Sequence, residues 1–318
     1  MSPEVSMREA YGKTLVELGK GNPDIVVLDA DLSKSTMTTF FAREFPERFF
    51  DCGIAEQNMI GIAAGLASSG KIPFASTFAV FVPGRCFDQI RVSIASPVLN
   101  VKLVATHGGI SVGEDGTSHQ SVEDLSLICS LPGFTVIVPA DAIEAAQAVR
   151  TAAASYGPFY IRLARLKVPL VYDDDYRFNL GKAVVMRQGK DATIIAIGLM
   201  VASALEAADN LKKEGIDCCV LNMPTLKPID EAAIKAATDS GAIVTAEEHL
   251  EHGGLGSIVA QVVARHQPVP MEFVAIKDTY AESGKPDELL QRYGLTAKDI
   301  ERAVHMVLKK KKPGVAGA

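Results

Sequence analysis

Residues 106–120, THGGISVGEDGTSHQ, concentrate side chains that could do chemistry. The segment holds two of the six histidines, His107 and His119, together with the adjacent carboxylates Glu114 and Asp115 and four glycines. At 15 residues it is long for a strand-to-helix connection. Long loops in compact domains are usually functional, so we expect a ligand site here. The alternative is an ordinary surface loop with solvated charges.

Glu56 is a second candidate, within residues 51–65, DCGIAEQNMIGIAAG. It stands at the start of an expected helix whose other members are mostly small or apolar. On these residues alone, two interpretations remain equal. A carboxylate in the first turn complements the helix dipole. A carboxylate in an apolar cleft has a raised pKa, which suits proton exchange with a ligand.

Two aromatic side chains and a glycine-rich segment are weaker signals. Phe78 and Phe81 lie three residues apart after an expected strand, a spacing more typical of core packing than of a cofactor platform. In residues 247–256, EEHLEHGGLG, the glycines precede an expected helix and could cradle an anion. The segment is not a G-x-G-x-x-G fingerprint, and His249 and His252 lack a third ligand at metal-site spacing. We therefore expect it to be structural.

These candidates follow short apolar runs that alternate with helical patterns. We expect strands at 25–28, 72–75, 101–105, 135–138 and 159–163, and helices at 57–68, 85–95, 122–130 and 142–154. Asp141 is the expected N-cap of the last of these helices. Continuous apolar strands between helices indicate a parallel sheet covered on both faces. Such sheets bind ligands beyond the carboxyl ends of their strands, where Asp31, Phe78 and His107 stand.

A second, smaller α/β series follows the acidic and aromatic segment 171–179. We expect its strands at 192–197, 218–222, 242–246 and 273–276, its helices at 200–213, 231–237, 256–265 and 297–308, and a turn at 226–230. The predicted fold class is therefore α/β, with two doubly wound open-sheet domains. Their predicted ranges are 1–172 and 190–312, with a linker at 173–189 and a tail at 313–318.

Composition excludes several classes of protein. The 318 residues are 48% hydrophobic and 22% charged, with a net charge of −6, so a disordered or collagenous chain is excluded. The acidic balance argues against nucleic-acid binding. The five cysteines are odd in number and form no C-x-x-C, which fits a reducing cytosol rather than disulfides or zinc. With neither a signal segment nor an apolar span visible, we expect a cytoplasmic protein that does not enter membranes.

Five segments together resemble the C-terminal half of transketolase. In the family's order and spacing they are ADLSKS (30–35), GIAEQ (53–57), STFAVF (76–81), GEDGTSHQ (113–120) and LARLKVP (163–169). LKPID (226–230) is similar to the family's small C-terminal domain. The resemblance covers nearly the whole chain, as a pyrimidine-binding module followed by a transketolase C-terminal domain. It is specific because independent segments agree.

The resemblance implies a thiamine diphosphate enzyme whose active site is shared with a second polypeptide. In the family, another module binds the diphosphate and a divalent metal through a G-D-G motif, which this sequence lacks. That matches a split-gene transketolase, in which an N-terminal partner subunit carries this module and mainly holds the Mg²⁺ (or Ca²⁺). No metal ligand is expected here.

The resemblance further implies an α2β2 heterotetramer in which this chain is inactive alone. The implied reaction transfers a two-carbon ketol unit from a ketose phosphate to an aldose phosphate, as in the pentose phosphate pathway.

The resemblance also implies roles for single residues. Glu56 matches the glutamate that hydrogen-bonds the aminopyrimidine ring and favours its imino tautomer. His119 and Asp115 match residues that contact sugar hydroxyls, and His119 can accept or return a proton. The resemblance implies cofactor contacts by Phe81, Phe78, Asp31 and Ile54. It also implies a phosphate clamp made by Arg8, Ser35, His107 and Arg165. Guanidinium groups grip phosphate oxygens with two parallel hydrogen bonds.

Alternatives remain at this point. Residues 82–89, VPGRCFDQ, depart from full-length transketolases toward deoxyxylulose-phosphate synthases and 2-oxoacid dehydrogenases. Arg85 is therefore either structural or a substrate contact, and the chain could be the beta-type subunit of such an enzyme. A non-catalytic assembly subunit is a third possibility, against which the intact Glu56, Asp115 and His119 speak.

Overall fold

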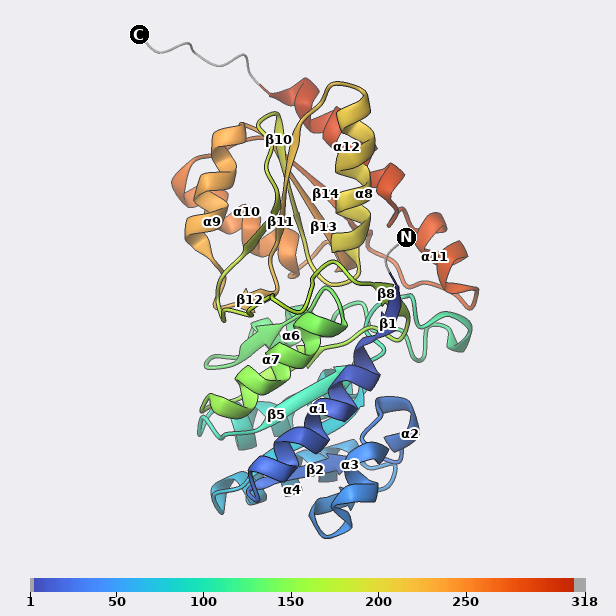
Figure 1. The fold of residues 1–318 in the computed structure, drawn as a ribbon, viewed down its shortest axis with the longest axis vertical. Helices are drawn as coiled ribbons and strands as arrows, with labels where there is room; N and C mark the ends of the chain where they lie inside the picture. The colour runs from blue at the N-terminus through green and yellow to red at the C-terminus, as the bar shows by residue number, and fades with distance from the viewer. Residues whose placement is uncertain (1–2, 312–318) are drawn as a thin grey trace.

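The computed structural model describes residues 3–311 and contains two α/β domains, each built on its own sheet (Figure 1). The strands of the first sheet are β2 Ile25–Asp29, β3 Phe49–Asp51, β4 Ile72–Phe78, β5 Lys102–Thr106, β6 Thr135–Ile137, β7 Phe159–Arg162 and β12 Thr225–Lys227. Their order is β12-β6-β7-β5-β4-β2-β3. Neighbours run parallel except β12, which is antiparallel to β6.

Helices cover both faces of this sheet because successive strand residues alternate between two apolar clusters. Val27 packs with α1 Met7–Gly21 and α7 Ala142–Ala154, whereas Val26 and Leu28 pack with α4 Glu56–Ser68 on the opposite face. The second face also carries α5 Val82–Gln89, the π-helix η2 Ile90–Ala95 and α6 Asp124–Cys129. The doubly wound arrangement predicted for the first domain is thereby confirmed.

The second sheet contains β9 Val184–Arg187, β10 Ala192–Ala196, β11 Cys218–Asn222, β13 Ile243–Leu250 and β14 Met271–Ile276. Its order is β14-β13-β10-β11-β9, with only β9 antiparallel to its neighbour. One face carries α8 Met200–Lys213 and α12 Ala297–Lys310, and the other carries α9 Glu231–Ala237 and α10 Leu255–His266 (Figure 1). The predicted α/β fold of this half is also confirmed.

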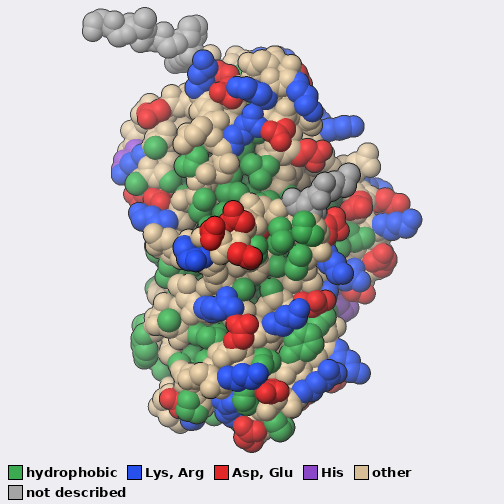
Figure 2. All heavy atoms as spheres, viewed as in Figure 1, with side chains coloured by type: hydrophobic (Ala, Val, Ile, Leu, Met, Phe, Trp, Pro, Cys, Tyr) green, Lys and Arg blue, Asp and Glu red, His purple; other side chains and the backbone are tan. Residues whose placement is uncertain are grey.

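Shorter elements complete the described chain. They are β1 Glu4–Ser6, α2 Ser33–Thr36, α3 Thr39–Glu44, η1 Pro46–Arg48, η3 Gly113–Asp115, β8 Lys167–Pro169, η4 Thr238–Ser240 and α11 Pro286–Arg292. Within residues 3–311, every helix is too short or too polar to cross a lipid bilayer. On the face drawn in Figure 2, acidic and basic side chains are interspersed over both domains.

Strand β12 differs from the expectation of a plain turn at 226–230. Although it comes from the second half of the chain, it forms the edge of the first sheet, with Thr225 opposite Ile137. The Lys227 ammonium group donates hydrogen bonds to the carbonyls of Cys129 (2.9 Å) and Leu131 (2.5 Å). The turn follows β12, and Asp230 then caps α9 by accepting from the Ala233 N–H at 3.1 Å. The two domains therefore share a sheet as well as a core.

The start of the expected linker, 173–189, is fixed to the first domain through Tyr176, and the residues just before it are held there by Asp141. Asp141 caps α7 as predicted, accepting from the Glu144 N–H at 2.9 Å, and its other oxygen accepts from the N–H groups of Val171 (2.9 Å) and Tyr172 (3.0 Å). The Tyr176 hydroxyl donates to Glu144 at 2.6 Å. Strand β9 already belongs to the second sheet, although it begins inside the expected linker, 173–189.

One helix was not expected from the sequence, and one expected segment falls outside the described residues. Helix α1 was not predicted from the sequence; it begins after Ser6, whose side chain caps it by accepting from the Glu9 N–H. The expected tail, 313–318, and residue 312 lie outside the described residues.

Candidate functional site

The candidate residues gather at the carboxyl edge of the first sheet. Strands β2, β4, β5 and β7 are parallel and in register, so that Phe78 is paired with Thr106 and Arg162 with Ala105. The loops that leave these strands therefore begin side by side. One of them is the segment 106–120, which contains η3 and ends before α6.

An aromatic cluster occupies the centre of this edge. The Phe78 ring stacks on the His107 ring with centroids 3.8 Å apart, and on the Phe81 ring at 5.7 Å. His119 meets the Phe81 ring edge-on at 5.5 Å. The loop thus returns to the site at its far end: His107 contacts Phe78, and His119 lies against both phenylalanine rings. Phe78 is buried, whereas Phe81 and His119 are half-exposed.

Glu56 lies beside this cluster at the first position of α4. Its side chain is only 6% exposed, and Oε1 accepts a hydrogen bond from Arg85 at 2.7 Å. The same guanidinium group lies over the Phe81 ring, with Cζ 3.8 Å from the centroid. Arg85 thus contacts both the carboxylate and the aromatic face. A buried carboxylate next to a ring face is a suitable place for a flat group that donates N–H hydrogen bonds.

A cluster of basic groups lies on the other side of His107. Arg8, near the start of α1, donates to the carbonyls of Ser35 (2.6 Å) and Arg165 (2.9 Å). Arg165 donates to the Val112 carbonyl at 2.7 Å and lies 3.4 Å from Glu114. Among the described residues, the buried Nε of Arg8 has no hydrogen-bond partner. Two guanidinium groups and an unused N–H make this cluster a candidate anion site.

His107 is held in an unusual conformation and charge state. Its backbone is left-handed, with φ 62°, and Thr106 Oγ1 lies 2.8 Å from its Nδ1. Burial lowers the pKa of His107 to about 3, and the positive charges of Arg8 and Arg165 act in the same direction. The ring is therefore neutral near pH 7, and Nε2 can contact a ligand without carrying charge.

Asp31 lies on the loop that follows β2, and Ile54 lies on the loop that follows β3. Asp31 is exposed, has φ 60°, and donates its N–H to Asp51 at 3.1 Å. The preceding Asp29 is fully buried and fixes this loop by accepting from the Leu32 N–H at 2.6 Å. Burial raises the pKa of Asp29 to about 6. Ile54 is 78% exposed, which is unusual for a large apolar side chain.

Asp115 lies on the single turn η3, where it is exposed to solvent. The structure thus brings His107, His119, Phe78 and Phe81 into direct contact and joins Arg8 to both Ser35 and Arg165. Asp115, Asp31 and Ile54 are exposed on neighbouring loops. The part played by Arg85 was left open by the sequence, since spacing alone does not show which carboxylate it meets.

The other glycine-rich segment is structural, as expected. The N–H groups of Leu255 and Gly256 at the start of α10 both donate to the buried Glu247 carboxylate at 2.7 Å. The anion at this helix start is therefore the protein's own side chain. Within residues 3–311, no group of three or more His, Cys, Asp or Glu residues is placed to hold a metal ion.

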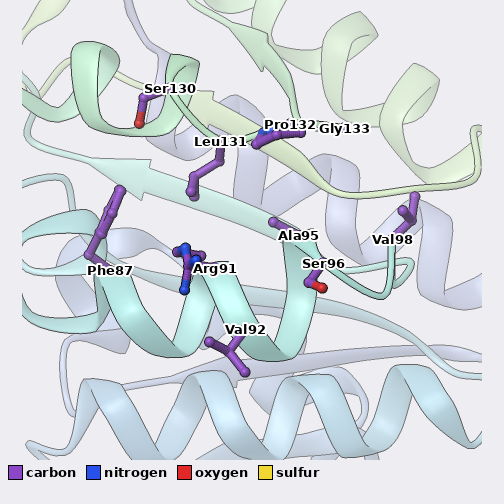
Figure 3. A pocket seen from close by; sticks show the side chains of 10 residues that line it. All are labelled: Phe87, Arg91, Val92, Ala95, Ser96, Val98, Ser130, Leu131, Pro132 and Gly133. Carbon is purple, nitrogen blue, oxygen red and sulfur yellow. The ribbon is translucent and has the colours of Figure 1, made fainter.

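A large surface groove lies away from these residues (Figure 3). Its volume is about 610 Å³, and Phe87, Arg91 and Leu131 are among the side chains around it. None of the candidate site residues lines it. The candidate site is instead an open edge of the domain, with Ile54 and half of Arg85 facing solvent.

Both halves of the chain are similar to domains of known proteins. Residues 3–171 match the family model described as the pyrimidine binding domain of transketolase, and residues 181–300 match the transketolase C-terminal domain. A Methanocaldococcus jannaschii protein, provisionally named as a transketolase C-terminal section, is 48% identical over 96% of this chain and 96% of its own length. A Clostridium 6-deoxy-6-sulfo-D-fructose transketolase subunit is 43% identical over 96% of this chain and 95% of its own.

A solved structure is also similar to this chain in sequence and in fold. A split-gene transketolase, described as an inactive beta4 tetramer, superposes with a TM-score of 0.91 at 54% identity. The match covers 97% of this chain and 100% of that one.

The neutral state of His107 can be tested by NMR. With a pKa of about 3, the ring carbon resonance of His107 should not move between about pH 7.5 and about pH 5. The resonance is assigned by its loss in the His107→Asn variant, because Asn tolerates the left-handed backbone. A titration midpoint inside that range would contradict the burial argument.

Proposed function

This chain belongs to the transketolase family as a transketolase-type subunit, and we propose that it acts with a separate partner chain. In this proposal the pair transfers a two-carbon ketol unit between sugar phosphates. The observation that carries the proposal is the convergence at one edge of three groups. They are a buried carboxylate beside an aromatic face, a pair of guanidinium groups, and two histidines between them.

Thiamine diphosphate is the cofactor that this site fits. Glu56 would hydrogen-bond its aminopyrimidine ring, Phe81 and Phe78 would pack on the ring, and Asp31 and Ile54 would border it. Arg85 supports this assignment, because a flat, N–H-donating guanidinium already occupies both the Glu56 carboxylate and the Phe81 face. When bound, the cofactor supplies the nucleophilic carbon and the electron sink of the reaction. The protein orients it and provides the carboxylate.

The sugar would lie between the cofactor and the basic cluster. Arg8, Ser35, His107 and Arg165 would hold its terminal anionic group, with His107 donating or accepting a hydrogen bond as a neutral ring. His119, between Phe81 and the loop, would exchange a proton with a sugar hydroxyl, and Asp115 would orient a neighbouring hydroxyl. A clamp of two guanidinium groups suits a phosphate, and it also suits the sulfonate of the sugar named for the Clostridium relative.

The diphosphate and its divalent metal, Mg²⁺ or Ca²⁺, fall to the partner chain in this proposal. The site on this chain supplies the pyrimidine side only, and its exposed Ile54 and open edge suit coverage by another subunit. An α2β2 assembly would cover two such sites. The similarity to a beta tetramer described as inactive is consistent with a chain that needs its partner.

Glu56→Gln tests the function in the complex with the partner subunit. We expect ketol transfer to fall by about 100-fold or more, because the amide is not an acid or base. Glu231→Gln is the matched control, since Glu231 is also the first residue of a helix. Circular dichroism checks folding. If both variants lower the rate of ketol transfer by the same small amount, Glu56 has only a helix-dipole role. If the complex turns over 2-oxoacids but not ketoses, the proposal is overturned.

Arg85→Ala tests whether Arg85 competes with the cofactor for Glu56. Because a half-exposed ion pair is worth about 1 kcal/mol, thiamine diphosphate should bind the complex about fivefold more tightly without it. Isothermal titration calorimetry measures the affinity, and Arg91→Ala, at an exposed arginine of the following helix η2, is the control. Weaker binding by the Arg85 variant would instead make Arg85 a cofactor contact.

Arg165→Ala tests the clamp. Loss of a charge-assisted hydrogen bond should raise the KM for a phosphorylated sugar by about tenfold or more, with little change for the same sugar without phosphate. Steady-state kinetics of the complex measure both, and Arg150→Ala on the exposed side of α7 is the control. Equal increases for the two sugars would remove Arg165 from the clamp.

A further inference from the structure

We infer that the second domain positions the loop 106–120, and that Glu248 on β13 is a positioning residue for Asp115 and His119. The inference deepens the proposed function and rests on it for the roles of those two side chains. It gives the second domain a part in substrate binding at a site built on the first domain. The supporting contacts occur at the base of the loop and at its tip.

At the base, the Glu248 carboxylate lies directly against the loop backbone. Its Oε1 accepts a hydrogen bond from the Ser111 N–H at 2.6 Å, across the junction of the domains. Gly109 passes so close that a Cβ placed on it would lie 2.1 Å from the carboxyl carbon of Glu248. Glu248 is only 4% exposed. A buried carboxyl group that accepts from a backbone N–H is costly to misplace, so this contact fixes the path of residues 109–111.

Arg162 also fixes the base of the loop, through hydrogen bonds and a close contact with the backbone. Its Nη2 donates to the carbonyls of Ser121 (3.1 Å) and Glu248 (3.0 Å), while its Nε donates to Asp124 at 2.9 Å. A Cβ on Gly108 would lie 2.4 Å from that Nε. Arg162 therefore ties both ends of the loop to β13 of the second domain. The loop cannot shift without breaking buried, charge-assisted hydrogen bonds.

At the tip, residues 281–286 of the second domain hold the part of the loop that carries the site. The Thr117 hydroxyl donates to the Ala281 carbonyl at 2.5 Å, and the Gln120 amide donates to the Glu282 carbonyl at 3.0 Å. Gly116, with φ 70°, lies against Ser283. In Figure 1 the teal loop at the domain junction lies beneath α11, which begins at Pro286. Thr117 and Gln120 flank His119, so the second domain sets where His119 stands.

The consequence is geometric. Glu56 and Arg8 are placed by the first domain alone, but Asp115 and His119 are placed by both domains. Catalytic groups displaced by about 1 Å can lose about 100-fold in rate. A loosened loop should therefore lower turnover more than it lowers cofactor affinity, because the proposed cofactor contacts lie on other loops.

Glu247 provides a matched control on the adjacent residue of β13. It is equally buried, but its two oxygens accept from Leu255 and Gly256 within the second domain. Removal of its carboxylate should cost stability without touching the loop. Any general effect of losing a buried carboxylate from β13 is therefore measured by Glu247→Ala.

The experiment compares Glu248→Ala, Glu248→Gln and Glu247→Ala in the complex with the partner subunit. Amide hydrogen exchange of residues 108–120 is the first readout and needs no activity. We expect exchange there to be about tenfold faster in Glu248→Ala, unchanged in Glu247→Ala, and largely restored in Glu248→Gln, whose amide oxygen still accepts from Ser111. Equal exchange in all three variants would overturn the inference.

Kinetics and cofactor binding are the second readout. For Glu248→Ala we expect kcat to fall by about tenfold or more with the affinity for thiamine diphosphate unchanged, and Glu248→Gln should recover most of kcat. If Glu248→Ala does not fold, Thr117→Val serves instead, because it removes only the exposed hydroxyl contact to Ala281. Faster exchange at 115–119 with lower kcat supports the inference, and unchanged exchange and kcat overturn it. A wild-type complex without ketol transfer would overturn the proposed function, while the exchange data would still decide whether Glu248 positions the loop.

Discussion

The buried ion pair between Arg162 and Asp124 is the interaction on which the arrangement of the molecule depends. Both side chains are removed from solvent, and the Tyr160 hydroxyl donates to the same Asp124 oxygen at 2.7 Å. Loss of one partner in such a pair costs about 3–5 kcal/mol, because it strands a charge in the interior. The Nη2 group of Arg162 also donates to the carbonyls of Ser121, directly after the loop, and of Glu248 on β13. One guanidinium group thus joins the first sheet, α6, the candidate site and the second domain.

This construction separates the site into a rigid part and an open part. The loop 106–120 is held at Ser111 by Glu248 and at Thr117 by the Ala281 carbonyl, and Ser121 directly after it is held by Arg162. The region around Glu56 and Ile54 faces outward, and the Arg85 side chain that covers Glu56 is half-exposed. A half-exposed ion pair is weak enough to exchange for another donor. In the proposed function, the open part is the part that a second chain completes, and the rigid part is the part that contacts the sugar.

Much of the local structure was predictable because it depends on neighbouring residues. Asp141 is a side chain that caps the helix directly after it, and α8 and α9 begin and end where their apolar patterns do. By contrast, α1 was not predicted, and it packs against α7 and α3. Strand β12 is three residues long and pairs with a strand almost ninety positions earlier, so no local pattern could place it. Glu248 fell in a segment that the sequence analysis set aside as structural.

The sequence by itself determined the family, since five motifs in the first half of the chain and one in the second resemble transketolase in order and spacing. It also determined two α/β halves, because buried strands and covering helices have different apolar periods. Only the tertiary structure decided that Arg85 shares the carboxylate and ring face of Glu56 and Phe81, and that Glu248 reaches the loop from the other domain. The physical reason is that the hydrogen bonds to Glu56 and to Glu248 join residues 29 and 137 positions apart, and local sequence patterns do not show which distant residues the folded sheets bring together.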